Sequence, residues 1–460
     1  MKENKISGLN GIRNSGLSPA NTLFWISASA VLAILHSHHY LDSDEGIVLN
    51  GAWQAYQGKV PYRDFFEFIP PGCFYLLAGL WKLTGLSYAW ARLVSVILIL
   101  GTAIGVYLIA GFFQTGRKKF IAPALIIILS SAWPAINHNS YQLFFAVWSA
   151  YFFLKPGNDS VRLPLVAISG LLAGVSALFL QQKGIALFIA FLLAILIKKE
   201  SIKARAKQLI LFAFSAAIPA ISLFLLFPLP EIYHDIVIFP IFNYNEANSL
   251  PLYLWSLFLL WLSITALLLY RTGGQRLKVL LIIGLLLLLS SLPRPDAVHL
   301  TMAAFPLVSL LPAVIAKIVA GRSGTFNSEN VALVVIGGLL LPILLADIAM
   351  LAVKKPLGGR ERSELLSYIA ANCADPFDYI YAGPFIPGIY FESRMQNPTP
   401  YSFLIEGMHT EAQFEEARRN LERTLPRCAV LNTAIAKKFG HTSENPVEQF
   451  IYSKKILRYI

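Results

Sequence analysis

Long apolar runs alternate with short polar segments along most of the chain. A helix that crosses the hydrocarbon core of a bilayer needs about 20 mostly apolar residues. On this rule the sequence predicts an α-helical, polytopic membrane protein with about eleven transmembrane helices. They are expected near residues 22–39, 87–113, 120–136, 141–154, 163–181, 184–197, 208–229, 252–270, 279–292, 300–319 and 331–353.

The basic residues gather in every second connection between these runs. They are Arg117, Lys118, Lys119, Lys155, Arg162, Lys198, Lys199, Lys203, Arg205, Lys207, Arg271, Arg276, Lys278, Lys317 and Arg322. Connections rich in lysine and arginine stay on the cytoplasmic side of a membrane. The pattern therefore predicts a multi-pass protein of the cell (inner) membrane. Its polar tail, 1–21, is expected in the cytoplasm, and an odd number of spans places the C-terminus outside.

Composition agrees with a membrane protein and argues against several soluble domains. Hydrophobic residues make up 56% of the 460 residues, and the mean hydropathy is +0.59. Charged residues make up 14%, whereas soluble domains carry roughly 25%. The net charge of +12 comes largely from the short basic connections, so it sets topology and does not indicate a nucleic-acid partner.

The first outer loop, 40–86, lies between the first two predicted spans and is rich in charged residues. Its first part, 40–72, holds seven acidic and basic residues. Asp42 can cap a helix that carries Glu45 in its first turn, and Gly58 is a typical helix end. Residues 73–84 are apolar but too short to span a bilayer. We therefore expect two helices that lie on the membrane surface.

The C-terminal part, 354–460, has the composition of a separate extracytoplasmic domain. Helical patterns at 361–372 and 414–424 alternate with strand patterns at 378–382 and 428–431, which predicts a small α/β domain. It has no glycine-rich phosphate motif, so we assign it no catalytic role. The three cysteines have no metal-ligand spacing. Cys373 and Cys428 share this domain, and a disulfide and a pair of free thiols are both compatible with the topology.

Asp44 and Glu45 are the candidate catalytic residues. One of these carboxylates can act as a general base that takes the proton of an acceptor hydroxyl. The alternative is that both acids only favour the positive end of the surface helix. The residues themselves support the two interpretations equally.

A family resemblance favours the catalytic interpretation. The stretch DSDEG, then a helix, G-x-x-PYRDF and PPG, and an apolar run with Ala91-Arg92-Leu93 resemble the first outer loop of GT-C glycosyltransferases. The protein O-mannosyltransferases and the lipid A aminoarabinose transferases belong to this group. The resemblance covers the first hundred residues well, and FLQQKG and RPDAVH are also similar to bacterial members. It implies that 22–353 is a GT-C-like catalytic domain, with Asp44 as the base and Glu45 as its partner.

Four basic residues are candidates for holding the donor phosphate, and two acids are candidates for supporting them. The basic residues are Arg63, Lys183, Arg294 and His299, and the acids are Asp64 and Asp296. A guanidinium matches the geometry of a phosphate, and fixed donors stabilise a phosphate that gains charge as it leaves. The alternatives are a salt bridge within the loop for Arg63 and Asp64, an outer turn for Lys183, and a proline-stiffened turn for 293–299.

The resemblance implies a membrane glycosyltransferase that moves a sugar from a polyprenyl-phosphate carrier to a hydroxyl on the outer face, usually with inversion. The acceptor would be a glycan, a lipid or a protein. Related enzymes often have an acid in the second outer loop, where this chain has His138 and Asn139, so these two are weak candidates for acceptor binding. No cofactor is expected, and dependence on a divalent metal is left open. The alternatives are a transporter or flippase of a lipid-linked sugar and an oligosaccharide polymerase or ligase.

Overall fold

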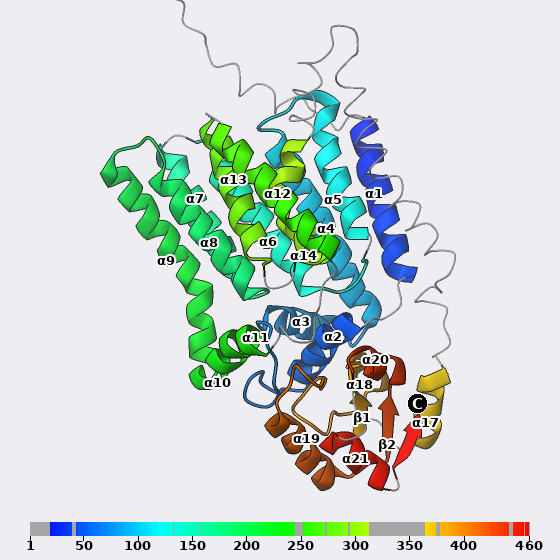
Figure 1. Cartoon of the computed structure of the whole chain (residues 1–460). Helices are drawn as coiled ribbons and strands as arrows, with labels where there is room; N and C mark the ends of the chain where they lie inside the picture. Colours follow the sequence, from blue (N-terminus) through cyan, green and yellow to red (C-terminus); the bar gives the residue numbers. More distant parts are fainter. Residues whose placement is uncertain are drawn as a thin grey trace, which may run out of the picture.

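The computed structural model describes a helical bundle with an α/β domain at one end (Figure 1). It describes residues 19–38, 43–131, 133–157, 159–243, 252–271, 274–292, 295–311, 364–373, 378–440, 445–454 and 456–459. The bundle helices are α1 (Pro19–His38), α4 (Tyr88–Ala110), α5 (Ile121–Ser131), α6 (His138–Leu154), α7 (Asp159–Ala177), α8 (Gln181–Leu196), α9 (Ile202–Leu226), α12 (Leu252–Arg271) and α13 (Gln275–Leu289).

These helices fall where the apolar runs predict them, with ends that differ by a few residues. By length and composition, α1, α4 and α9 can each cross a membrane. Large apolar side chains of α9 such as Ile210 and Phe214 are 71% and 67% exposed, as expected of a surface that faces lipid. The fold is therefore that of a helical, polytopic membrane protein.

The predicted run 300–319 differs from the structure. The short helix α14 (Ala297–Ala303) ends at Ala304, and a further helix begins at 305. The predicted span at 331–353 lies outside the described residues. The number of spans therefore stays a prediction.

The two ends of the bundle differ in charge. The connections α4–α5, which contains the 3-10 helix η1 (Gly116–Phe120), α6–α7 and α8–α9 lie at the end away from the α/β domain (Figure 1). They carry many of the basic residues that the sequence places in the cytoplasm. The opposite end carries the first outer loop and the segment α10 (Leu229–Tyr233), η2 (His234–Ile238, a π-helix) and α11 (Phe239–Phe242).

The first outer loop forms the two predicted helices, α2 (Ser43–Tyr56) and α3 (Gly72–Thr84). Asp42, the predicted cap, lies outside the described residues. Every residue of α2 from Glu45 to Ala55 is buried, so the protein itself encloses this helix, and its placement at the membrane surface stays a prediction. This helix is covered on one side by the bundle and on the other by the α/β domain (Figure 1).

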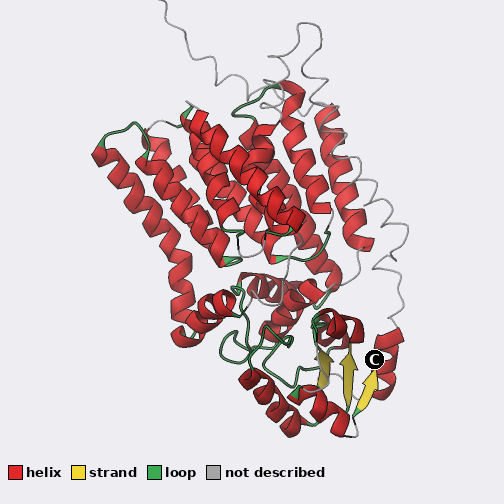
Figure 2. Ribbon diagram, viewed as in Figure 1, coloured by secondary structure: helices red, strands yellow, loops and turns green. Residues whose placement is uncertain are grey.

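The C-terminal residues form a three-stranded parallel sheet with helices around it (Figure 2). Strands β1 (Ile380–Gly383), β2 (Cys428–Leu431) and β3 (Leu457–Tyr459) lie in this order. The helices are α17 (Glu364–Asn372), α18 (Gly388–Ser393), α19 (Glu411–Thr424), α20 (Thr433–Lys438) and α21 (Pro446–Ser453). All residues of β1 and β2 are buried, as is typical of a parallel sheet covered on both faces. Cys373 and Cys428 form a disulfide.

The α/β domain packs directly on the first outer loop. The Ser43 hydroxyl donates to the Phe385 carbonyl at 2.6 Å, and the backbone N–H of Phe66 donates to the Pro400 carbonyl at 2.8 Å. The rings of Trp81 and Phe391 stack with centroids 4.9 Å apart. These contacts fix the start of α2, which carries Asp44, against the C-terminal domain.

Candidate active site

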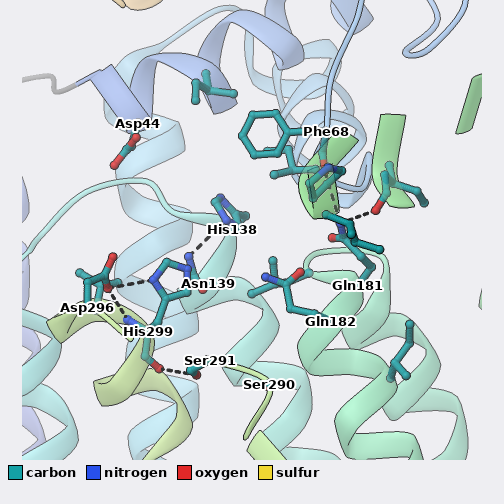
Figure 3. A pocket seen from close by; sticks show the side chains of 18 of the residues that line it. Asp44, Phe68, His138, Asn139, Gln181, Gln182, Ser290, Ser291, Asp296 and His299 are labelled. Carbon is teal, nitrogen blue, oxygen red and sulfur yellow. Dashed lines mark hydrogen bonds and ion pairs between the residues drawn. The ribbon is translucent and has the colours of Figure 1, made fainter. Parts of the chain in front are cut away.

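A cavity of about 540 Å³ lies between α2 and the end of the bundle. Its polar lining comes from α2, α6, the start of α8, the end of α13 and the start of α14, and an apolar wall comes from η2 and α11 (Figure 3). The polar lining residues are Asp44, His138, Asn139, Gln181, Gln182, Ser290, Ser291, Asp296 and His299. Five of the candidates from the sequence, which lie far apart in the chain, therefore meet at one cavity.

Asp44 and Glu45 lie on different sides of α2. Asp44 lines the cavity, whereas the Glu45 side chain is fully buried. Successive residues of a helix point about 100° apart, so two neighbours cannot face the same cavity equally. Glu45 accepts hydrogen bonds from the Tyr88 hydroxyl at 2.6 Å, from Arg92 Nη2 at 2.5 Å and from the Ile136 N–H at 2.9 Å. Glu45 therefore holds α2 in place.

Arg92 completes this anchor. Its side chain is 3% exposed, and its Nη1 donates to the carbonyl oxygens of His36, at 3.1 Å, and Pro134. Arg92 thus joins α1, α2, α4 and the segment before α6. Arg92 had no predicted role, although an arginine inside an apolar span needs a buried partner and is a signal for such an anchor.

Asp296 and His299 form a second hydrogen-bonded pair. Asp296 caps α14, and its Oδ1 accepts from the backbone N–H of His299 at 2.9 Å. The same oxygen is 2.8 Å from His299 Nδ1. Figure 3 shows the ring of His299 with Asp296 on one side and Asn139 on the other. The contact with the backbone N–H fixes the first turn of α14, and the contact with Nδ1 fixes the orientation of the His299 ring.

Lys183 is buried beside this pair. Its Nζ is 3.3 Å from the His299 carbonyl and 3.4 Å from Asn139 Oδ1. The interpretation of Gln181, Gln182 and Lys183 as an outer turn is wrong, because they form the first turn of α8 and Lys183 is fully buried. The sequence predicted a turn there because three polar residues interrupt an apolar run. The buried cation instead has polar partners from α6 and α14.

His138 and Asn139 begin α6, with Asn137 as its N-cap. The amide nitrogen of Asn139 lies 3.2 Å from His138 Nε2 and 3.1 Å from Asn137 Oδ1. Asn139 therefore connects Lys183 to His138. The two candidates for acceptor binding lie on the same side of the cavity as the candidates for phosphate binding.

Arg63 and Asp64 do not line the cavity. They form an ion pair at 2.8 Å with side chains 59% and 32% exposed. Asp64 also accepts from the Val60 N–H at 2.7 Å, and the hydrogen bond from Arg63 lowers the pKa of the Asp64 carboxyl. The structure thus places these two in a turn of the first outer loop. Arg294 lies outside the described residues.

Several lining residues were missed from the sequence. Gln181 donates from Nε2 to the Ile236 carbonyl at 2.9 Å and to the Phe68 carbonyl at 3.4 Å, which joins α8, η2 and the first outer loop. Next to this wall, burial raises the pKa of Asp235 to about 6, against the hydrogen bond from His234. Polar residues such as these carry no local signal, because their partners come from other parts of the chain.

No family model and no curated protein matches this sequence. Solved structures are similar in fold. The structure of ArnT from Cupriavidus metallidurans bound to undecaprenyl phosphate has a TM-score of 0.57 and 13% identity, with 96% of this chain and 90% of that chain covered. The oligosaccharyltransferase AglB from Archaeoglobus fulgidus, in complex with an inhibitory peptide and a dolichol-phosphate, has a TM-score of 0.56 and 12% identity, with 91% and 70% covered.

The chain shares the overall fold of these solved structures. This agrees with the resemblance seen in the first outer loop. Because the identities are 12–13%, the similarity establishes the GT-C fold and leaves the chemistry to the residues of the cavity.

Proposed function

We propose that this GT-C protein is a membrane glycosyltransferase that transfers a sugar from a polyprenyl-phosphate carrier to a hydroxyl acceptor on the outer face of the membrane. The observation that carries the proposal is the convergence of Asp44 with His299, Asp296 and His138 on one cavity. A carboxylate faces basic and amide side chains there, as transfer from a phosphate leaving group to a hydroxyl requires.

Asp44 is the proposed general base. It takes the proton of the acceptor hydroxyl, whose oxygen attacks the anomeric carbon while the bond from that carbon to the phosphate oxygen breaks. Attack from the face opposite the phosphate inverts the anomeric centre. Glu45 is held by Arg92, Tyr88 and Ile136, so we assign it to positioning α2 and Asp44.

The donor phosphate is proposed to lie at the His299 side of the cavity. The charge that develops on the leaving phosphate is stabilised there by His299, and by Lys183 directly behind it. Ile185 and Ile241 line the cavity and are each 56% exposed, so the cavity borders the lipid-facing surface. An isoprenoid chain fits such an apolar border. Arg63 and Asp64 pair with each other outside the cavity lining, so the proposal gives them no part in the transfer.

Two features of the chain support the proposal that the cavity lies on the outer face of the membrane. The Cys373–Cys428 disulfide belongs to the domain at the cavity end, and disulfides persist outside the reducing cytoplasm. The basic connections lie at the opposite end of the bundle, as cytoplasmic connections do. We therefore propose a cytoplasmic N-terminus and an extracytoplasmic C-terminus.

The test is sugar transfer by the purified full-length protein in lipid nanodiscs. The donors are a panel of polyprenyl-monophosphate sugars, and the variants are Asp44→Asn and Asp64→Asn. The Asp64 variant is matched, because it makes the same change in the same loop outside the cavity lining. Loss of a general base lowers the rate by about 10²–10⁴-fold.

We expect this loss for Asp44→Asn and a rate close to wild type for Asp64→Asn. Equal activity of wild type and Asp44→Asn would remove Asp44 from the role of base. Transport of a lipid-linked sugar across vesicles without a transfer product would favour the flippase alternative. Activity with diphosphate donors alone would favour the polymerase or ligase alternative.

A further inference from the structure

We infer that Asp296 is a positioning residue that acts through His299, holding its imidazole as a charged donor to the phosphate of the lipid carrier. The inference rests on the proposed function. It explains how the imidazole of His299 is kept positively charged in the site. It starts from the two contacts that a single carboxylate oxygen makes with one residue.

The contacts of Asp296 determine which ring nitrogen of His299 carries the proton. Asp296 Oδ1 lies 2.8 Å from His299 Nδ1 and 2.9 Å from the His299 backbone nitrogen. An ionised carboxylate only accepts hydrogen bonds, so Nδ1 is the protonated nitrogen. Nε2 is the nitrogen on the other side of the ring, and the side chain of His299 lines the cavity. In the imidazolium form it is a second N–H donor.

The other histidine of the cavity has the opposite arrangement. Lys183 Nζ donates to Asn139 Oδ1, which fixes the orientation of the Asn139 amide. Asn139 Nδ2 then donates to His138 Nε2, at 3.2 Å, so this nitrogen is the acceptor. An amide N–H group therefore donates to the ring of His138, whereas a carboxylate oxygen contacts the ring of His299. Of these two rings, His299 is the one whose surroundings favour a proton on both nitrogens.

The charged groups around His299 come from three other elements. Lys183 of α8 lies against its carbonyl, and His138 of α6 is close enough to interact electrostatically. Asp44 of α2 lines the same cavity. His138, whose Nε2 accepts from Asn139, is neutral, so Lys183 is the group that disfavours a positive charge on His299, and the carboxylate in direct contact has to offset it. A charge-assisted hydrogen bond to phosphate is roughly twice as strong as a neutral one.

The test separates the charge of Asp296 from its capping role. Asp296→Asn keeps an N-cap, because asparagine caps helices as well as aspartate, but it removes the negative charge. Binding of undecaprenyl phosphate to the full-length protein in nanodiscs is measured between about pH 5 and pH 9, the range in which histidine titrates. Asp235→Asn is the control, because Asp235 titrates in the same range and does not line the cavity.

We expect wild-type affinity to fall as the pH rises through one midpoint. Asp296→Asn should lower this midpoint by about one pH unit and keep the affinity at low pH, while Asp235→Asn leaves the midpoint in place. His299→Gln should remove the shift that Asp296→Asn causes, and leave the pH dependence that comes from the second ionisation of the phosphate itself, with a pKa of about 6. An unchanged midpoint in Asp296→Asn overturns the inference, since a purely structural cap gives that result. Absence of binding by wild type at every pH overturns the proposed function and this inference with it.

Discussion

The carboxylate of Glu45 and the guanidinium of Arg92 form a buried ion pair with 2.5 Å between Oε2 and Nη2. The two side chains are 0% and 3% exposed. Because the pair joins α2 to α4, the residue before Glu45 has a defined position at the cavity. Of the two neighbouring acids, Glu45 therefore anchors the helix, and Asp44 faces the cavity.

Glu45→Gln should destabilise the protein. Removal of one partner from a buried ion pair leaves an uncompensated charge and costs about 3–5 kcal/mol. Thermal unfolding in nanodiscs measures the loss. Glu415→Gln is a matched control, because Glu415 forms an exposed ion pair with Arg418, and we expect almost no change there. A Glu45→Gln protein with wild-type stability and no activity would instead indicate a direct catalytic role for Glu45.

The buried carboxyl group of Glu67 should make the free energy of unfolding depend on pH. It is buried between the first outer loop and the α/β domain, where Ser402 donates to its Oε1 at 2.5 Å, and burial raises its pKa to about 8. The folded state keeps this proton from about pH 4.5 to about pH 8, whereas the unfolded state has lost it. The free energy of unfolding should therefore fall as the pH rises through this window, by about 1.4 kcal/mol per unit.

Glu67→Gln keeps the acceptor for Ser402 and should remove the slope between about pH 7 and pH 8. Below about pH 7 it should reduce the slope and leave the contribution of Glu392, whose pKa burial raises to about 7. Denaturant unfolding of wild type and variant at a series of pH values measures the slope. Asp235→Asn is a useful comparison, because Asp235, with its pKa raised to about 6, contributes to the slope only below about pH 6. A slope above pH 7 that persists in Glu67→Gln would show that another group is responsible.

Gly46 lies where α2 meets the α/β domain. A Cβ at this position would be 2.5 Å from the Gly388 nitrogen and 3.2 Å from Pro387 Cγ. Gly46→Ala should therefore push α18 away from α2, lower stability by about 1–3 kcal/mol and displace Asp44, with loss of activity. Gly79→Ala in α3 is the control, since nothing lies within 4 Å of its Cβ. Equal stability and activity of both variants would contradict a tight contact.

The disulfide should contribute to the stability of the α/β domain. Cys373 and Cys428 are 55 residues apart, and a cross-link of this kind contributes about 2–4 kcal/mol. The double variant Cys373→Ala, Cys428→Ala should unfold at a lower temperature, and a reductant should lower the wild-type transition to the same value. A reductant that shifts the double variant equally would show an effect unrelated to this bond.

Hydrophobic patterning alone determined most of the secondary structure. The sequence predicts the bundle helices, the two helices of the first outer loop and strand β2 with its observed bounds. These features are local, since a span requires an apolar run and a strand requires a short buried one. The disulfide was left open, because a pairing depends on distance in space.

The tertiary structure decided which polar residues act together. Nothing local distinguishes Asp44 from Glu45, and only the partners on α4 and before α6 show which one is the anchor. The same holds for Lys183, whose partners lie on α6 and α14, and for α2, which is buried because a domain some 340 residues later in the chain covers it. The sequence determines each segment through short-range patterns, whereas the site depends on contacts between segments, which only the packed fold contains.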